Sequence, residues 1–388
     1  SSSLNHPDYY SGRTPLMYIL HEIFNPFLKT QDSYRISVFI FSFLLPILFY
    51  FCLKQKFKNE DKILLLLIST TVLLSPYFRT SSFWGLEENY GLIFLLLSFL
   101  SLNYLLQNNN SEGYKIYLQI FLVTFFSSCC LYFDYKLTLI PILCLLKIIF
   151  SEKFIKYKIF SVFCYSVFSL PFLYLVSLWG GLVQSRVAEI RLEEELLVSH
   201  IGYSSTMIAL YLFPLLFFKK ESLISLKKNF FLDKRNYYFI GLFFVYLIFL
   251  INNLILDEQI LIEEGGYTHG LSSKTEPISL GKGFVHKISI IFFKSVFFRE
   301  IFTYLAFLGS WLVILLFIRK NINNFIIIFF FFSISLIIFP ILQEYFDPLI
   351  LLLAFTFFDT KMNINYKNSM ALYLYLAVFL IGSNFYYN

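Results

Sequence analysis

The sequence predicts an all-α integral membrane protein, and its composition, its lack of charge and its hydropathy pattern all indicate this class. Of the 388 residues, 58% are hydrophobic, 21% are aromatic and only 14% are charged, whereas about a quarter of residues are charged in ordinary soluble domains. So few polar residues cannot cover a globule, and apolar side chains must therefore face lipid. Long apolar runs alternate with polar segments along the whole chain, which excludes a soluble domain. Nothing in the sequence indicates nucleic-acid binding.

The apolar runs predict a single transmembrane domain over residues 1–388 with about 11–12 helices. A helix needs about 20 apolar residues to cross the hydrocarbon core of a bilayer. The runs at 137–150 and 349–358 are short, so we expect them to cross only if they extend into their flanks or lie inside protein. The candidate spans in chain order are 33–53, 62–78, 89–106, 115–133, 137–150, 159–178, 201–218, 237–256, 301–318, 325–342, 349–358 and 371–386.

The charges of the connecting segments predict which side of the membrane each one occupies. When the segments are assigned to alternate sides, Lys and Arg outnumber Asp and Glu on one side, and acidic residues predominate on the other. The basic side is cytoplasmic by the positive-inside rule. All five histidines lie on the opposite side, and the middles of the spans are nearly free of charge, which favours a site at the non-cytoplasmic face over a conduction path. The non-cytoplasmic segments are 1–32, 79–88, 134–136, 179–200, 257–300 and 343–348.

Two segments on the non-cytoplasmic side predict amphipathic helices that lie in the membrane interface. In residues 14–28, the side chains of Leu16, Leu20, Ile23 and Phe27 share one helical face, with His21 and Glu22 off that face. Residues 286–299, inside the long non-cytoplasmic segment 257–300, combine Lys287, Lys294 and Arg299 with large apolar side chains. The alternative is that both segments are weakly hydrophobic flanks of spans. Two interfacial helices on one face would wall a groove for a lipid-linked ligand.

Glu87 and Glu88 precede the span at 89–106 and are candidate catalytic carboxylates. A carboxylate here can position a sugar or accept a proton from a hydroxyl group. The simpler explanation is a favourable interaction with the helix dipole, which contributes about 0.3–1 kcal/mol for each acidic residue. Arg79 can bind a phosphate through two hydrogen bonds, or it can anchor the chain at the interface.

Three further polar segments carry candidate ligand-binding residues. The loop 179–200 turns at a glycine pair and ends at His200, which is either a ligand-facing donor or a polar boundary residue. The Gly-rich stretch within 263–287, which contains His269, is long for a connector and is expected to form a mobile flap. Glu344 and Asp347 lie in the short connection before Pro348, where they either cap a helix or bind sugar hydroxyls.

The five cysteines indicate neither a disulfide framework nor a zinc site. All of them lie inside apolar runs, so we interpret them as small buried hydrophobic residues. The sequence requires no metal and no cofactor.

Several of these segments, in this order, resemble the GT-C superfamily of polytopic glycosyltransferases that use polyprenyl-phosphate sugars. Within it, the chain resembles the dolichyl-phosphate-glucose-dependent alpha-1,2-glucosyltransferase family and its bacterial relatives. The matching stretches are PDYYSGRTPLMYIL at 7–20, RTSSFWGLEENYG at 79–91, the Trp-Gly-Gly loop that ends at His200, and QEYFDPL at 343–349.

The resemblance implies a role for each candidate residue. Asp8 with Glu87 or Glu88 is assigned to the catalytic acids, and Arg13 and Arg79 to phosphate. Members of the superfamily carry their main acidic residue just after the first span, and this chain begins with Ser, so we expect its first transmembrane helix to be missing or a signal peptide to have been removed. The remaining substrate-binding candidates are His200, His269, Glu344 and Asp347, together with Lys136, which lies in a short loop where the family tends to show Arg and Gln.

The predicted function is the transfer of a hexose from a polyprenyl-phosphate donor to a lipid-linked or surface glycan at the non-cytoplasmic face. The expected location is a bacterial plasma membrane rather than the endoplasmic reticulum. A transporter or lipid-linked sugar flippase is the alternative, and it predicts broken or charged spans and a repeat between the two halves. A polysaccharide polymerase or ligase is a further alternative, favoured by one large loop rich in arginine.

Overall fold

The computed structural model is helical in the residues that it describes, which are 14–107, 113–151, 153–183, 196–219, 234–256, 282–319 and 321–387. No strand occurs in these ranges, where a single isolated bridge pairs Lys219 with Met362. The predicted all-α class is therefore confirmed. Within the same ranges, five helices are long and apolar enough to cross a membrane, or six if one bent pair of helices counts as one span. These are the helices of a multi-pass membrane protein.

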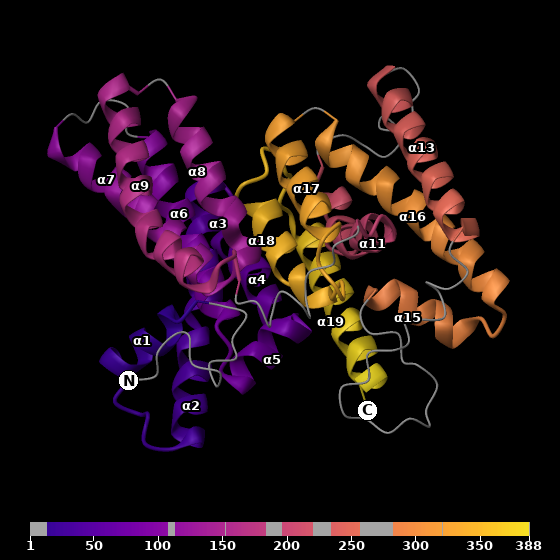
Figure 1. Ribbon diagram of the computed structural model, residues 1–388, viewed down its shortest axis with the longest axis horizontal. Coiled ribbons are helices and arrows are strands. Elements are labelled where there is room, and N and C mark those ends of the chain that lie inside the picture. The colour runs from indigo at the N-terminus through magenta and orange to yellow at the C-terminus, as the bar shows by residue number, and fades with distance from the viewer. Residues whose placement is uncertain are drawn as a thin grey trace. The chain divides into compact units, whose positions relative to one another are not determined.

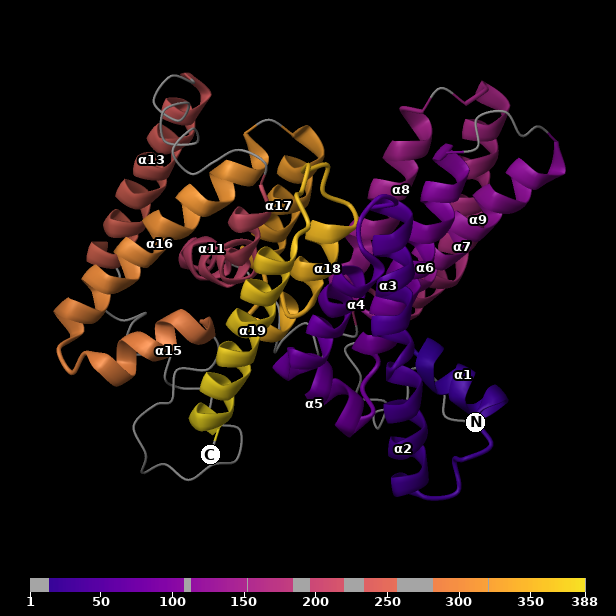
Figure 2. The same cartoon turned by 180° about the vertical axis from the view of Figure 1, so that it is seen from behind.

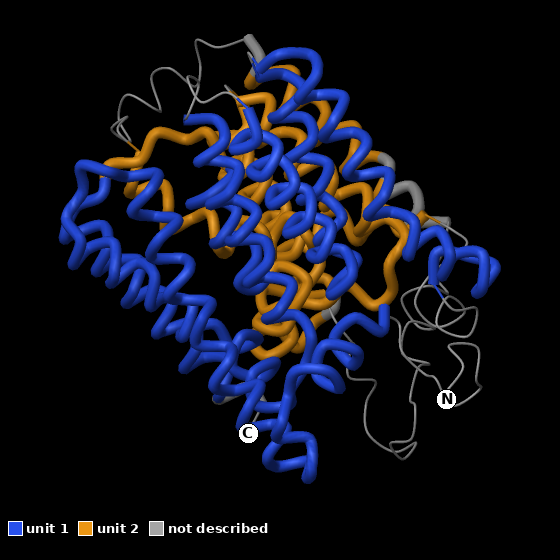
Figure 3. The backbone as a smooth tube through the Cα atoms, turned by 90° about the vertical axis from the view of Figure 1, so that its left-hand side faces the viewer, with its two compact units in different colours: residues 1–190, 347–357, 364–388 blue, residues 191–346, 358–363 orange. Residues whose placement is uncertain are grey.

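The chain divides into two compact units, coloured blue and orange in Figure 3. Unit 1 contains residues 1–190, 347–357 and 364–388, and unit 2 contains residues 191–346 and 358–363. Each unit is described separately below. The single transmembrane domain expected from the sequence stays a prediction.

Unit 1 contains the N-terminal helices and the last two helices of the chain, which Figures 1 and 2 show from opposite sides. Its elements are α1 (Leu16–Phe24), α2 (Gln31–Ser42), α3 (Leu44–Lys56), α4 (Lys62–Thr70), the 3-10 turn η1 (Thr71–Leu74), α5 (Pro76–Trp84), α6 (Glu88–Gln107), α7 (Tyr114–Phe133), the 3-10 turn η2 (Tyr135–Thr138), α8 (Leu139–Ile149), α9 (Ile155–Trp179), α18 (Leu349–Phe355) and α19 (Tyr366–Tyr387).

Helices α6 and α7 form the centre of unit 1. Helix α3 packs against α6, helices α8 and α9 pack against α7, and α4 links α3 to α19. The first turns of α6 are buried on every side, because the six consecutive residues from Glu88 to Ile93 are all buried. At Gly91 an added Cβ would lie 2.6 Å from Leu137 Cδ1 and 3.3 Å from Phe133 Cβ, so this glycine allows the close approach of α6 to α7 and η2.

Unit 2 is built around α11, whose residues from Ser204 to Ala209 are all buried. Helices α15, α16 and α17 pack against α11, and α13 packs against α16. An aromatic cluster that includes Phe243, Tyr246, Phe307 and Trp311 joins these helices. The elements of unit 2 are α11 (Ser199–Leu212), the 3-10 turn η3 (Pro214–Phe218), α13 (Lys234–Leu256), α15 (Gly283–Phe292), α16 (Val296–Ile318), α17 (Ile322–Ser335) and the 3-10 turn η4 (Gln343–Tyr345).

Every predicted span contains a helix, although several of these helices are shorter than the apolar run around them. The run 62–78 bends by 64° at the break before Pro76, because Pro76 begins a new helix and the Ser75 hydroxyl accepts the Phe78 N–H at 2.9 Å. The run 349–358 yields only α18, whose seven residues are all buried, so protein and not lipid surrounds them.

The first predicted amphipathic segment contains helix α1, and its placement in the interface stays a prediction. Leu16 and Leu20 of its apolar face contact a core cluster around Met17, Ile23 of the same face is 64% exposed, and His21, off that face, is buried. The second segment, 286–299, is not one helix, because α15 ends at Phe292 and α16 begins at Val296.

Replacing Gly202 with alanine is predicted to destabilise unit 2. An added Cβ would lie 2.2 Å from Phe307 Cε2, and that ring is 2% exposed and cannot move freely. Overpacking of this kind costs about 1–3 kcal/mol, measurable as a lower thermal unfolding temperature in detergent. The control is Gly309→Ala on α16, where no atom lies within 4 Å of the added Cβ and where alanine stabilises a helix by up to about 1 kcal/mol. Equal unfolding temperatures for the two variants would contradict the packing described here.

Candidate functional site

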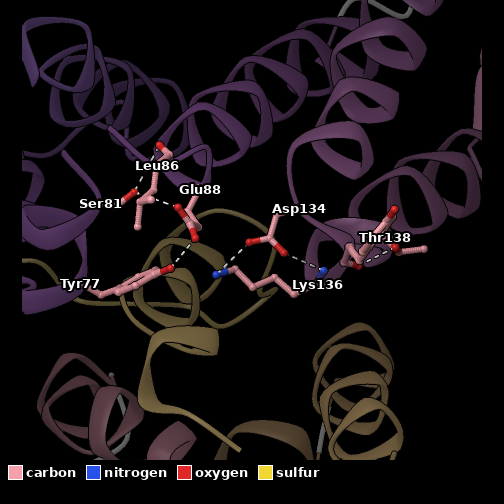
Figure 4. A network of polar contacts seen from close by, with 8 residues as sticks. Tyr77, Ser81, Leu86, Glu88, Asp134, Lys136 and Thr138 are labelled. Carbon is pink, nitrogen blue, oxygen red and sulfur yellow. Dashed lines mark hydrogen bonds and ion pairs between the residues drawn. The ribbon is translucent and has the colours of Figure 1, made fainter. Parts of the chain in front are cut away.

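The candidate site lies in unit 1 and begins with the buried carboxylate of Glu88 (Figure 4). Glu88 is 1% exposed, and its Oε1 accepts a hydrogen bond from the Tyr77 hydroxyl at 2.5 Å while its Oε2 accepts one from Ser81 Oγ at 3.0 Å. Gly85 makes this possible, because its left-handed conformation (φ +70) ends α5 and reverses the chain. The first residue of α6 therefore lies back against α5.

Asp134 and Lys136 form the second part of the site, in the short connection between α7 and α8. Asp134 Oδ1 accepts the backbone N–H of Lys136 at 3.1 Å, which begins the turn η2. The Lys136 ammonium lies 3.0 Å from Asp134 Oδ2, and the two side chains are only 9% and 10% exposed. Lys136 Nζ is also 5.2 Å from the centre of the Tyr77 ring. Figure 4 shows the Tyr77 hydroxyl, the Glu88 carboxylate and the Lys136 ammonium directed toward one another.

Asp347 joins the site through the backbone of Tyr77. Its Oδ2 accepts the Tyr77 N–H at 3.1 Å, and the side chain is 3% exposed. A carboxylate at this place is favourable, because the first turn of α5 carries unsatisfied N–H groups and the positive end of the helix dipole. Tyr77 thus contacts Asp347 through its backbone, Glu88 through its hydroxyl and Lys136 through its ring.

The site contains three buried carboxylates and one ammonium group. Asp134 pairs with Lys136, while Glu88 and Asp347 each accept a hydrogen bond from Tyr77. A buried carboxylate is stable only when hydrogen-bond donors or cations replace the water that it has lost. Chemically, the cluster offers carboxylate oxygens that can accept a proton or bind hydroxyl groups, and an ammonium that can bind an anion.

Glu87 and Arg79, predicted from the sequence to belong to the same site, face other surroundings. Glu87 is buried, but its charge acts on Tyr34 of α2, and its carbonyl accepts the N–H groups of Tyr90 and Gly91 at 3.1 and 3.2 Å. Arg79 is exposed on α5, and its guanidinium makes no hydrogen bond or ion pair with the residues that the structure describes. Glu87 lies in the turn that precedes α6, whereas Glu88 is the first residue of that helix, and the two side chains have different neighbours.

The remaining predicted residues fall elsewhere. His200 lies in unit 2, where it is 1% exposed, its Nδ1 lies 3.0 Å from the Ile338 carbonyl oxygen and its ring stacks on Phe339. Glu344 also belongs to unit 2, in η4, and is partly exposed. Asp8, Arg13 and His269 lie outside the described residues.

Tyr77 and Asp134 are site residues that the sequence interpretation did not select. Asp134 carries a recognisable signal, because it lies with Lys136 in a three-residue polar connection between two spans. Tyr77 carries none, since it is one of 28 tyrosines and its role depends on the bend before α5. Among the residues that the structure describes, no group of three or more His, Cys, Asp and Glu side chains could hold a metal ion.

A separate hydrogen-bond chain in unit 1 determines the protonation of His21. Asn25 Oδ1 accepts the Phe27 N–H at 2.9 Å, which orients the amide so that Asn25 Nδ2 faces His21 Nδ1 at 2.8 Å and Ser37 Oγ at 2.8 Å. His21 Nδ1 is therefore the acceptor, and the proton of the neutral imidazole is on Nε2. Burial lowers the pKa of His21 below its usual 6.5, in agreement with a neutral ring between α1 and α2.

Comparisons of the chain with protein-family models, with curated proteins and with solved structures find no match. The family resemblance inferred from the sequence motifs therefore stays a prediction.

Removing the Tyr77 hydroxyl is predicted to destabilise the protein through Glu88. Hydrogen bonds to charged groups contribute about 1.5–3 kcal/mol, so Tyr77→Phe should lower the thermal unfolding temperature in detergent. The effect should shrink in a Glu88→Gln background, where no carboxylate charge remains. Tyr104→Phe, at a tyrosine of α6 that is 53% exposed, is the matched control. An equal loss from Tyr77→Phe in both backgrounds would show that the hydroxyl does not act through Glu88.

Acidification is predicted to weaken the docking of α1. The pKa of His21 is lowered in the folded protein, so the state in which α1 is undocked binds more protons. The contribution of His21 to the docking free energy is therefore fully present above about pH 6.5 and is lost as the pH falls below that value. Protonation also places an N–H on Nδ1 opposite the Asn25 amide N–H groups. Hydrogen exchange of α1, corrected for the intrinsic rate, should accelerate between pH 7.5 and 5.5.

Asn25→Asp is the matched variant for this pH effect. A carboxylate at position 25 accepts both the Phe27 N–H and a protonated His21 Nδ1, so it should raise the pKa of His21 and remove the acid sensitivity. If hydrogen exchange in the wild type and in Asn25→Asp shows the same pH dependence, the orientation assigned to His21 is wrong.

Proposed function

We propose that the protein transfers a hexose from a polyprenyl-phosphate donor to a lipid-linked or surface glycan acceptor at the non-cytoplasmic membrane face. The observation that carries this proposal is the convergence of Glu88, Asp134 and Lys136 around Tyr77. Sugar transfer from a phosphate ester to a hydroxyl group uses a base for the hydroxyl proton and a cation for the phosphate. The carboxylates and the ammonium of this site, inside a unit of apolar helices, can supply both.

In the proposed reaction, Glu88 is the general base. Its carboxylate takes the proton of the acceptor hydroxyl, and the acceptor oxygen attacks the anomeric carbon. The bond from that carbon to the phosphate oxygen breaks, and the electron pair leaves with the lipid phosphate. Lys136, which pairs with Asp134 in the absence of substrate, offsets the negative charge that develops on the phosphate. Because phosphate is already a good leaving group, no general acid is needed.

The proposal also includes the finer architecture expected from the sequence. It comprises a GT-C-like bundle of about 11–12 transmembrane helices, with interfacial helices on the non-cytoplasmic side and a location in a bacterial plasma membrane. Helix α1, with Tyr18, Ile23 and Phe24 exposed, and helix α15 are the elements that we propose lie in the interface.

Transport of a polar solute is the second candidate, and one observation favours it. The apolar segment Lys62–Leu74, formed by α4 and η1, meets α5 at a 64° bend, and buried Asp347 accepts a backbone N–H of the first turn of α5 at this break. Broken helices with a polar group at the exposed terminus are typical of transporter binding sites. Substrate-dependent uptake into proteoliposomes, without transfer of the sugar, would favour this function.

The test of the transferase is transfer from a labelled polyprenyl-phosphate hexose by the purified protein in lipid. Removing a general base lowers a rate by about 100-fold to 10,000-fold, so Glu88→Gln should lose at least two orders of magnitude. Glu87→Gln should reduce the transfer rate less, because Glu87 acts on Tyr34 of α2. Glu22→Gln, at an exposed position of α1, should transfer at the wild-type rate. Wild-type rates in Glu88→Gln would remove Glu88 from the mechanism.

A further inference from the structure

Unit 2 contains a cluster of cations that the proposed reaction does not use, at the corner between α15 and α16. Lys282 immediately precedes α15, and His286 lies in the first turn of that helix. Tyr203 of α11 contacts both, with its ring centre 5.4 Å from Lys282 Nζ and 5.2 Å from the centre of the His286 ring. Lys287 follows His286 directly in α15.

Arg299 brings a third permanent positive charge to this corner from α16. Its Nε donates to the Phe293 carbonyl at 2.6 Å and its Nη2 donates to the Lys294 carbonyl at 3.3 Å, which ties the start of α16 to the end of α15. A guanidinium has five N–H donors, so three remain after these two hydrogen bonds.

The electrostatic environment of His286 shows that the corner has a positive potential. Burial, followed by the charges of Lys282, Arg299 and Lys287, lowers the pKa of His286 to about 4. These three charges are positive, and Glu300, which follows Arg299 in α16, is the one acidic residue between positions 282 and 300. The buried Nδ1 atom of His286 has no hydrogen-bond partner within the described residues, although a buried polar atom ordinarily has one.

These cations lie beside the start of the candidate span in α16. The span in α16 begins at Phe297, and the end of a transmembrane helix lies at the level of the membrane interface. Beside the cations, Ile291, Phe292, Phe297 and Phe298 are between 57% and 74% exposed. Cations interleaved with exposed large apolar side chains are typical of a helix that lies on an anionic membrane surface.

We propose that Lys282, Lys287 and Arg299 bind the phosphate of an anionic membrane phospholipid at the corner between α15 and α16, with His286 beside it. The remaining Arg299 donors and the two ammonium groups supply charge-assisted hydrogen bonds to phosphate oxygens, and the exposed apolar side chains contact the acyl chains. This site is independent of the transferase proposal, because it requires neither a sugar donor nor the Glu88 cluster.

The proposed site has a pH dependence that a merely cationic surface lacks. A bound phosphate offsets the positive charges of Lys282, Lys287 and Arg299 and so raises the pKa of His286, while the Tyr203 ring on α11 adds no charge near neutral pH. By linkage, lipid affinity should rise as the pH falls toward the raised pKa of the bound state. His286→Gln should abolish this rise and keep the binding at pH 7.5.

The experiment is native mass spectrometry of the purified protein with added phosphatidylglycerol or phosphatidylcholine. The wild type should retain phosphatidylglycerol preferentially. A Lys or Arg near an anionic surface contributes about 1 kcal/mol, so Lys282→Gln/Lys287→Gln should lower the apparent affinity by about 30-fold. The matched control is Lys62→Gln/Lys367→Gln, which removes two exposed lysines from unit 1 and should leave retention unchanged.

Three results would overturn the proposal. They are equal retention of the two lipids by the wild type, unchanged retention of phosphatidylglycerol by Lys282→Gln/Lys287→Gln, and displacement of the lipid by millimolar inorganic phosphate, which would indicate a site for free phosphate instead. Arg299→Lys tests the same assignment without loss of charge, since an ammonium cannot replace the forked donors of the guanidinium. Equal thermal unfolding temperatures for the variants and the wild type show that each variant is folded.

Discussion

The burial of carboxylates among apolar helices is the constraint on which the rest of unit 1 depends. An ionised carboxylate without donors costs several kcal/mol in such a place, so each one must find partners as the helices pack. Tyr77 supplies a hydroxyl to Glu88 and a backbone N–H to Asp347, and Lys136 pairs with Asp134. The bend before α5 and the reversal at Gly85 are the backbone features that bring these partners together.

The position of this cluster at helix ends follows from backbone chemistry. The first N–H groups of a helix have no partner within it. A helix that begins inside an apolar unit therefore requires acceptors for these N–H groups, and the N–H groups in turn stabilise an acidic side chain. Asp347 at α5 and Asp134 at η2 satisfy this need with their side chains, while Glu87 contributes its carbonyl to the first turn of α6. The same contacts that complete the fold therefore concentrate negative charge in one place.

Unit 2 handles charge in the opposite way. Its cations at the corner between α15 and α16 are partly exposed and adjoin large exposed apolar side chains, and three of them lower the pKa of His286. Long basic side chains are stable at a membrane boundary, because their aliphatic stems contact lipid while their charges reach the headgroups. In unit 1 protein groups replace the water that the buried carboxylates have lost, and in unit 2 lipid headgroups do the same for the cations.

The amino-acid sequence was sufficient to predict the helical membrane class, because each membrane-spanning helix must be apolar by itself. Five of the predicted spans contain helices long and apolar enough to cross a membrane, or six if the bent pair counts as one span. It also selected Glu88, Lys136 and Asp347 as candidate site residues, since polar residues at the ends of spans are conspicuous, and the structure brings all three to Tyr77. Their chemical roles stay predictions. Only the packing of the helices shows that Glu88 and Glu87 have different neighbours, that His21 is buried and that Tyr77 lies at the centre of the site. These outcomes depend on which helix ends meet, and Tyr77 and Asp347 are 270 residues apart, a distance at which no local pattern carries information about contact.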